Sequence, residues 1–397
     1  VAIGLKVVGY LLMAHLTDFW GFFTGCMFLA AGTAVFKPGV QGLLARVMKK
    51  EYASVGWGVF YQLVNVGGFL GPILAGYLRL LDWVYVFWAC AGIVSLNLIT
   101  LAAFEEPAHR NEKRDERTAA EVLWESVTGV LRPRILAFVL LFSGFWFMFN
   151  QIFDILPNFL DDWIDSGVLW GVWADLGIPG STLAAEMSAK GEPFNQEWLI
   201  NLNAGLIILI MVPIAWLTSF MTPLRSILLG ILVASAGTLF MGASTSVYLC
   251  IAAILVFSLG EMLSSPKKME YLASLAKPGE QGLFMGYANV PLAIGWGVGS
   301  VVGGWFYETF GDRTNLARHH LLEHFDVADT VSQAIPKDDV LPILASLLHQ
   351  TEPEVVHMLW TTYEPGQMWM LFAGIGLVSL VGLGAYDVVL RRYDSVT

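Results

Sequence analysis

Three ionisable side chains, Lys37, Asp154 and Glu261, lie inside long apolar stretches of the sequence. A charge at the centre of a bilayer costs about 2.5–3.5 kcal/mol on insertion scales, so such residues usually bind a substrate or an ion. Lys37 would supply a fixed positive charge for an anionic group. Glu261 and Asp154 would bind an amine or carry a proton, and the three residues together predict a central polar cavity. The alternative is a static lysine–carboxylate pair that holds helices together.

Neutral hydrogen-bonding side chains accompany these charges. Asn150 lies four residues before Asp154, which places both on one face of a helix. Asn65, Asn203 and Ser264 lie within other apolar stretches. The two asparagines Asn65 and Asn203 serve equally well as hydrogen bonds between helices.

These residues must be positioned by membrane helices. Only 14% of the 397 residues are charged and 56% are hydrophobic, whereas soluble proteins carry roughly 25% charged residues. This composition excludes a water-soluble domain, a disordered chain and a nucleic-acid-binding protein. Cys26, Cys90 and Cys250 lie in apolar stretches and form neither a disulfide framework nor a metal-ligand spacing. A spanning helix needs roughly 20 apolar residues, and the sequence predicts spans at about 1–17, 19–47, 53–78, 80–104, 133–162, 196–220, 223–243, 246–276, 279–308 and 364–391.

Lysine and arginine predict the orientation of these spans, because positively charged loops stay in the cytoplasm. Basic residues follow every second span, and Arg391 and Arg392 follow the last one. The opposite loops, about 163–195 and 309–363, are acidic. The pattern predicts an integral protein of a bacterial inner membrane with a cytoplasmic C-terminus.

The chain also matches itself at an offset of 228 residues. The glycines and proline that coincide are Gly32, Pro38, Gly58, Gly67, Gly71 and Gly76 with Gly260, Pro266, Gly286, Gly295, Gly299 and Gly304. Two repeats of the same topology are typical of secondary transporters. Three spans precede the second copy and only one precedes the first, so we expect two of twelve helices to be missing at the N-terminus.

This pattern predicts an all-α membrane protein with two pseudo-symmetric bundles. The expected parts are an N-terminal bundle at 1–104, a cytoplasmic linker at 105–132, and a C-terminal bundle at 133–397 with an extracytoplasmic insert at 309–363. Small residues spaced by four, Gly67-Gly71-Ala75 and Gly295-Gly299-Gly303, predict close helix packing in both repeats.

At these positions the sequence resembles the proton-dependent oligopeptide transporter family of the major facilitator superfamily. Phe36-Lys37-Pro38 is similar to the family's fourth-helix motif, and residues 57–72 resemble its FYxxxNxG signature with Asn65 at the asparagine. Residues 145–151 resemble its FWxxxEQ pattern, 196–213 its LNP segment, and 259–266 its ExxxSP motif. Asn150 replaces the glutamate of FWxxxEQ and Ala204 replaces the LNP proline.

The resemblance implies that Lys37 binds a peptide carboxylate and couples to protons, while Glu261, Asn203 and Asn65 meet the amino end. Asp154 is a substitute for the missing glutamate. The expected substrate-binding residues are Lys37, Asn65, Asn150, Gln151, Asn203, Glu261 and Ser264. The expected proton-coupling residues are Lys37, Asp154 and Glu261. We expect a monomer in the lipid bilayer that carries a short peptide or related small molecule, with the proton as coupling ion, no other cofactor and no nucleic-acid partner.

Three alternatives remain open at this point. The first is a transporter of the same fold for a different small solute. The second is a membrane enzyme in which His320 and His324 of the segment HLLEH bind zinc and Glu323 acts as a base. A solvated helix is the simpler interpretation of that five-residue match, and helix-like runs around 316–325 and 339–348 predict a small helical cap. The third is a receptor that kept the fold without transport.

Overall fold

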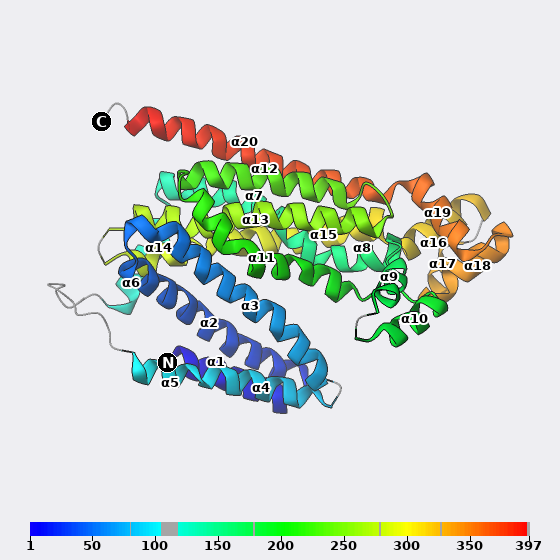
Figure 1. Cartoon of the computed structure of the whole chain (residues 1–397), viewed down its shortest axis with the longest axis horizontal. Helices are drawn as coiled ribbons and strands as arrows, with labels where there is room; N and C mark the ends of the chain where they lie inside the picture. Colours follow the sequence, from blue (N-terminus) through cyan, green and yellow to red (C-terminus); the bar gives the residue numbers. More distant parts are fainter. Residues whose placement is uncertain (80, 105–117, 178, 278, 326–327, 395–397) are drawn as a thin grey trace. The chain divides into compact units, whose positions relative to one another are not determined.

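The chain folds into helices of very different lengths (Figure 1). The computed structural model describes residues 1–397 apart from 80, 105–117, 178, 278, 326–327 and 395–397. The long helices are α2 (Phe19–Val47), α3 (Ala53–Arg79), α7 (Pro133–Asp154), α11 (Gln196–Thr218), α12 (Pro223–Met241), α13 (Val247–Leu275), α15 (Val290–Phe306) and α20 (Met368–Asp394). The shorter α-helices are α1 (Ala2–His15), α4 (Trp83–Ser95), α5 (Asn97–Ala103), α6 (Ala119–Val130), α8 (Leu156–Trp163), α9 (Val168–Leu176), α10 (Ser181–Lys190), α14 (Gln281–Tyr287), α16 (Arg313–Phe325), α17 (Asp329–Ala334), α18 (Val340–Leu348) and α19 (Glu352–Tyr363). Short 3₁₀ turns occupy η1 (Lys50–Tyr52), η3 (Lys337–Asp339) and η4 (Pro365–Gln367), and η2 (Tyr307–Gly311) is a π-helical turn.

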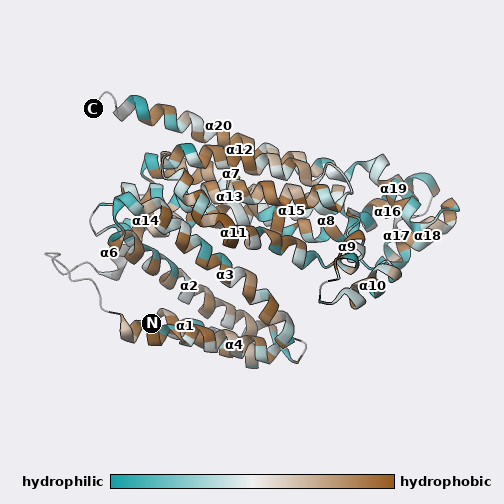
Figure 2. Cartoon of the chain, viewed as in Figure 1, coloured by the Kyte–Doolittle hydropathy of each residue, from teal (hydrophilic) through white to brown (hydrophobic). Residues whose placement is uncertain are grey.

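The described residues contain nine helical segments that are long and apolar enough to cross a membrane. Figure 2 shows hydrophobic residues along these helices and more hydrophilic ones in α16–α19. Pro38, Pro72, Pro213 and Pro266 lie within spanning helices, which membrane helices tolerate when neighbouring groups satisfy the freed backbone. The chain is therefore an integral membrane protein, and nine of the ten predicted spans coincide with helical segments of sufficient length and apolarity among the described residues. The prediction for 1–17 was too long, because α1 has only 14 residues.

Aspartate side chains cap the first turns of two helices. Asp18 caps α2 by accepting a hydrogen bond from the backbone of Gly21 at 2.9 Å, and Asp82 caps α4 in the same way through Val84.

The predicted span at 133–162 ends earlier, at Asp154, and continues as the separate helix α8. The acidic loop predicted at 163–195 contains the helices α9 and α10.

The two halves of the chain repeat the same helix pattern. Shifting the bounds of α2 by 228 residues reproduces those of α13, and both helices have 29 residues. The same shift carries the start of α3 onto Gln281, where α14 begins. The structure thus supports the internal repeat, although α3 is continuous while its counterpart is divided into α14 and α15.

Contacts divide the described chain into two units. Unit 1 comprises 1–136, 208–224 and 265–289, and unit 2 comprises 137–207, 225–264 and 290–397. These units cut through α7, α11, α12 and α13, so the predicted bundles at 1–104 and 133–397 stay a prediction. Of the predicted linker, residues 105–117 with their mixed charges lie outside the described residues, and α6 occupies much of the remainder.

Small residues pack helices closely in only one of the two predicted stripes. A Cβ atom on Gly295 of α15 would lie 2.6 Å from the side chain of Trp146 and 2.7 Å from the backbone of Phe147, both on α7. In contrast, Gly67 and Gly71 of α3 have open space at the Cβ position. Close packing along the α3 stripe stays a prediction, because that face of α3 is exposed within unit 1.

The core of unit 2 is built on α7. Phenylalanine side chains recur along this helix and stack on one another, with Phe138 and Phe142 at 5.4 Å and Phe142 and Phe145 at 5.1 Å between ring centroids. All three are fully buried. A helix buried on most of its surface positions its polar side chains firmly, and α7 carries three of the predicted site residues.

Candidate functional site

A buried carboxylate forms the centre of the candidate site in unit 2. The side chain of Asn203 on α11 donates a hydrogen bond to Glu261 Oε2 on α13 at 2.7 Å. The same amide donates to the hydroxyl of Ser258 at 2.9 Å. Glu261 is 2% exposed and Asn203 is 3% exposed. An ionised carboxylate so far from water needs such donors or a proton, and Asn203 supplies one donor to Glu261.

A cluster of aromatic side chains begins one helical turn before this carboxylate on α13 and continues on α7. Phe257, one helical turn before Glu261, lies 5.6 Å from Phe149 of α7, and Phe149 lies 4.7 Å from Trp146. These three residues are buried. The combination of one carboxylate and aromatic rings suits a solute that is both cationic and apolar.

Two amides of α7 lie in the same unit. Asn150 and Gln151 are 1% and 0% exposed, and their side chains donate to the backbone oxygens of Trp146 and Phe147 at 2.8 Å each. Gln151 also donates to Gly299 of α15 at 3.3 Å. Its Oε1 atom has no hydrogen-bond partner among the described residues, so this amide retains one free acceptor.

Asp154 lies at the end of α7 in a hollow of unit 2. It accepts hydrogen bonds from Ser300 at 2.6 Å and from the Trp296 indole at 3.3 Å, both on α15. The hollow has a volume of about 380 Å³. Its lining residues are Asp154, Ile155, Asn158, Asp161, Asp162, Ser300, Gly304, Tyr307, Glu308, Asp312 and Lys337. Five carboxylates against one lysine make this hollow a favourable place for cations.

Asp162 anchors one wall of that hollow. The hydroxyl of Tyr307 donates to its carboxylate, and the backbone N–H of Arg313 donates to it at 3.2 Å. Burial raises the pKa of Asp162, whereas the tyrosine and Arg313 oppose that rise. Sequence reasoning missed this residue, since an aspartate at the predicted end of a span gives no sign of burial.

The remaining predicted residues have less distinctive surroundings. Asn65 and Ser264 each donate to the backbone of their own helix, at Tyr61 and Gly260. Lys37 belongs to unit 1 and is exposed there. Since Glu261 belongs to unit 2, the predicted pairing of Lys37 with Glu261 stays a prediction.

The segment HLLEH lies on α16 of the helical cap. The rings of His320 and His324 are 4.2 Å apart, and His320 Nδ1 lies 3.1 Å from the Tyr363 hydroxyl. The described residues contain no group of three His, Cys, Asp or Glu side chains placed to hold a metal ion. The predicted helices at 316–325 and 339–348 are confirmed as α16 and α18.

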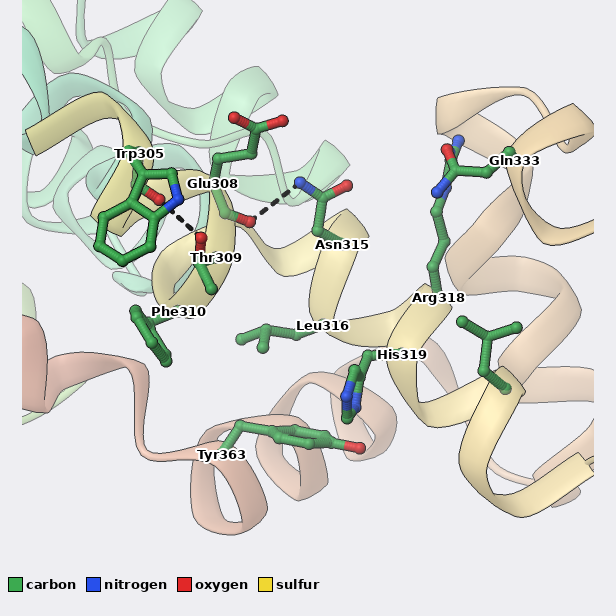
Figure 3. Close-up of a pocket in the computed structure, with 11 residues that line it drawn as sticks. Trp305, Glu308, Thr309, Phe310, Asn315, Leu316, Arg318, His319, Gln333 and Tyr363 are labelled. Atoms are coloured by element: carbon green, nitrogen blue, oxygen red, sulfur yellow. Dashed lines mark hydrogen bonds between the residues drawn. The ribbon is translucent and has the colours of Figure 1, made fainter. Parts of the chain in front are cut away.

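The cap also contains a pocket, shown in Figure 3. Its volume is about 720 Å³. Figure 3 shows the ring of Tyr363 beside His319, and the aromatic side chains of Trp305 and Phe310 on the other side. Arg318 points away from the centre and donates to Gln333 at 2.8 Å. The polar groups of this pocket therefore mainly hold the cap together.

Nine helical segments in the described part of the chain that are apolar enough to span a membrane, an internal repeat and a buried carboxylate define a helical membrane protein of the secondary-transporter class. The sequence pattern of the Major Facilitator Superfamily matches residues 1–224, more than half of the chain. The chain therefore belongs to the Major Facilitator Superfamily, and the family and the proteins similar to this chain are transporters rather than enzymes.

Two relatives are similar to most of this chain. "Multidrug resistance protein MdtH" of Photorhabdus laumondii is 23% identical over 77% of this chain and 69% of its own length. The protein of the same name from Edwardsiella ictaluri is 25% identical over 77% of this chain and 68% of its own length.

Three crystal structures share the fold at low sequence identity. The human organic anion transporter MFSD10 (TETRAN) has a TM-score of 0.59, 13% identity and coverage of 96% of this chain and 75% of its own. The E. coli fucose:proton symporter FucP has a TM-score of 0.57, 14% identity and coverage of 88% and 83%. The peptide transporter POT in complex with sulfate has a TM-score of 0.55, 15% identity and coverage of 98% and 79%.

Proposed function

We propose that this protein is a proton-coupled transporter that moves a small amphiphilic solute across the inner membrane by alternating access. The observation that carries the proposal is the buried hydrogen bond from Asn203 to Glu261 in unit 2. A carboxylate in this setting binds either a proton or a cationic group, and each state favours a different conformation. Competition between the two ligands at Glu261 would couple solute movement to the proton gradient.

The first candidate solute is a short peptide. A peptide carries an amino and a carboxylate end, and the chain offers Glu261 with Asn203 for the first and Lys37 for the second. Gln151, with its free acceptor, and Asn150 would meet the peptide backbone. Asp154 would take up protons from the acidic hollow, since it lies within it.

A second candidate is a hydrophobic organic cation. Two observations favour it: Asn150 replaces the glutamate found in the peptide-transporter pattern, and Trp146, Phe149 and Phe257 supply aromatic surfaces. The relatives named multidrug resistance proteins point in the same direction. Such a solute would need Glu261 and the aromatic rings but not Lys37.

Purified full-length protein in liposomes with an imposed pH gradient tests the proposal. The probes are dialanine for the peptide and ethidium for the organic cation. We expect gradient-driven movement of one probe, and we expect Glu261→Gln to reduce it by roughly tenfold or more, since a charge-assisted hydrogen bond is lost. Lys37→Ala should abolish dialanine movement and leave ethidium movement intact.

Glu197→Gln is the matched control, because Glu197 is an exposed glutamate at the start of α11. Its transport rate should equal that of the unmodified protein. Gradient-driven movement that survives Glu261→Gln unchanged would refute the assigned role of this carboxylate. Absence of gradient-driven movement for both probes would refute the proposed solute classes.

A further inference from the structure

Lys267 is a buried cation that the proposed site does not use. It lies on α13 immediately after Pro266 and is only 2% exposed. A buried ammonium group is stable only when its hydrogen-bond donors all find partners. The surroundings of Lys267 within unit 1 provide three such partners.

The three partners come from three helices. Lys267 Nζ donates to the hydroxyl of Ser54 on α3 at 2.7 Å and to the backbone oxygen of Thr218 on α11 at 2.9 Å. It also lies 2.9 Å from the carboxylate of Glu270 on its own helix. One side chain thus joins α3 to α11 and α13.

The hydroxyl of Ser54 continues the connection between α3 and α11. While it accepts from Lys267, it donates to the backbone oxygen of Ala215 at 2.9 Å. Further along the same face of α3, a Cβ atom on Gly58 would lie 2.4 Å from Ala215 Cβ, and Gln62 donates to the backbone oxygen of Ile208 at 2.6 Å. Residues 54, 58 and 62 are spaced by four, so they form a single contact stripe.

We propose that Lys267 is a positioning residue for transport: with Ser54 and Thr218 it forms a latch that holds α3 against α11 and α13, and the latch opens in each transport cycle. The proposal rests on the alternating access proposed above. α3 belongs to the first repeat, whereas α11 and α13 belong to the second half of the chain. Separation of the halves at this end must therefore break the bond between Lys267 and Ser54.

The arrangement suits a contact that breaks and re-forms. When α3 leaves, Lys267 loses Ser54 but keeps Glu270 and Thr218, which both lie in the second half. The charge stays paired throughout, so opening avoids the large cost of an isolated buried ion. Glu270 also lines a hollow of about 480 Å³ together with Lys50, Trp57 and Pro223, so water from this hollow would replace the Ser54 hydroxyl once α3 moves away.

Distance measurements between spin labels test the latch without any substrate. In the full-length protein with its cysteines replaced, labels at Glu51→Cys, beside α3, and Lys277→Cys, after α13, report the separation of these helices by pulsed electron resonance. In Ser54→Ala the closed state lacks one partner of Lys267. We expect the ratio of separated to closed molecules to rise by roughly tenfold, the loss typical of a hydrogen bond to a charged group.

Ser274→Ala is the matched control, because Ser274 lines the same hollow but donates to Tyr271 of its own helix at 2.6 Å. Its distance distribution should match that of the unmodified protein. Lys267→Met should raise the separated population at least as much as Ser54→Ala. If Lys267→Met does not fold, Ser54→Ala alone decides the question.

A fall in melting temperature of Ser54→Ala with an unchanged distance distribution would overturn the proposal, since it would show a purely structural contact. If the latch exists but the proposed function is wrong, the distances respond to Ser54→Ala, while neither dialanine nor ethidium moves with the pH gradient.

Discussion

A carboxylate buried in a membrane protein is stable only with hydrogen-bond donors or with a proton. Asn203 provides such a donor to Glu261, and Ser258 accepts the second hydrogen of the same amide. Because the amide bonds to both residues, it fixes the orientation of the carboxylate on α13. In the proposed transporter, this fixed geometry would distinguish a proton from a bulky cation.

His320 provides a prediction for the helical cap. Burial, together with the neighbouring His324, lowers the pKa of His320. The unfolded state then binds more protons than the folded state below the ordinary histidine pKa of about 6.5, so the cap loses stability as the pH falls through that value. We expect hydrogen exchange in α16 and α19, corrected for the intrinsic effect of pH, to quicken between about pH 7.5 and about pH 5. Replacement His320→Gln should remove most of this dependence.

The exposed His357 of α19 offers a control for that measurement. His357→Gln should retain the pH dependence, because its ring lies in water in both states. If His320→Gln and the unmodified protein respond equally to acid, the neighbouring pair of His320 and His324 is not the source of the pH dependence.

The sequence singled out charged residues in the middle of apolar stretches, but it did not single out every buried charge. Glu261 and Asp154 were found because a charge within an apolar stretch is costly wherever its helix lies. Lys267 was not singled out, although it lies inside the predicted span at 246–276. Its burial depends on Ser54 and Thr218, which are 213 and 49 residues away in the chain, and no local pattern indicates such partners.

At the scale of elements, the periodic glycines predicted the internal repeat, but they did not predict every contact between helices. The helix bounds repeat at 228 residues because both halves need the same helix lengths. Gly295 packs against α7, whereas the Cβ position of Gly67 lies in open space. The spacing of small residues therefore predicts a face along which a helix can pack closely, but it does not identify the helix that packs there.

The packed face of α15 yields a direct test. Gly295→Ala places a methyl group within 2.7 Å of the backbone of Phe147 and of the Ser143 backbone oxygen. We expect overpacking to lower the free energy of unfolding by about 1–3 kcal/mol, measured as a reduced melting temperature in detergent. Gly297→Ala on the same helix is the control, since nothing lies within 4 Å of its Cβ position. Equal melting temperatures for the two variants would contradict the contact between α15 and α7.

At the scale of the whole molecule, the orientation in the membrane follows from charge rather than from packing. Basic residues recur after every second span, and α20 ends with Arg391 and Arg392. Positive loops resist translocation, so the C-terminus should lie in the cytoplasm and the cap of α16–α19 on the opposite side. The latch at Lys267 would then lie on the cytoplasmic side, because η1 follows the basic residues Arg46 and Lys49.

Alkaline phosphatase fusions decide this orientation, because that enzyme needs disulfides and so is active only in an oxidising compartment. Joined after α20, the phosphatase should be inactive in whole bacteria. Inserted between α17 and α18, at Pro336, it should be active. The paired positions exclude poor expression as an explanation, since an inverted protein exchanges the two activities whereas a missing protein loses both. An active C-terminal fusion with an inactive cap fusion would reverse the orientation and assign the Lys267 latch to the outer side.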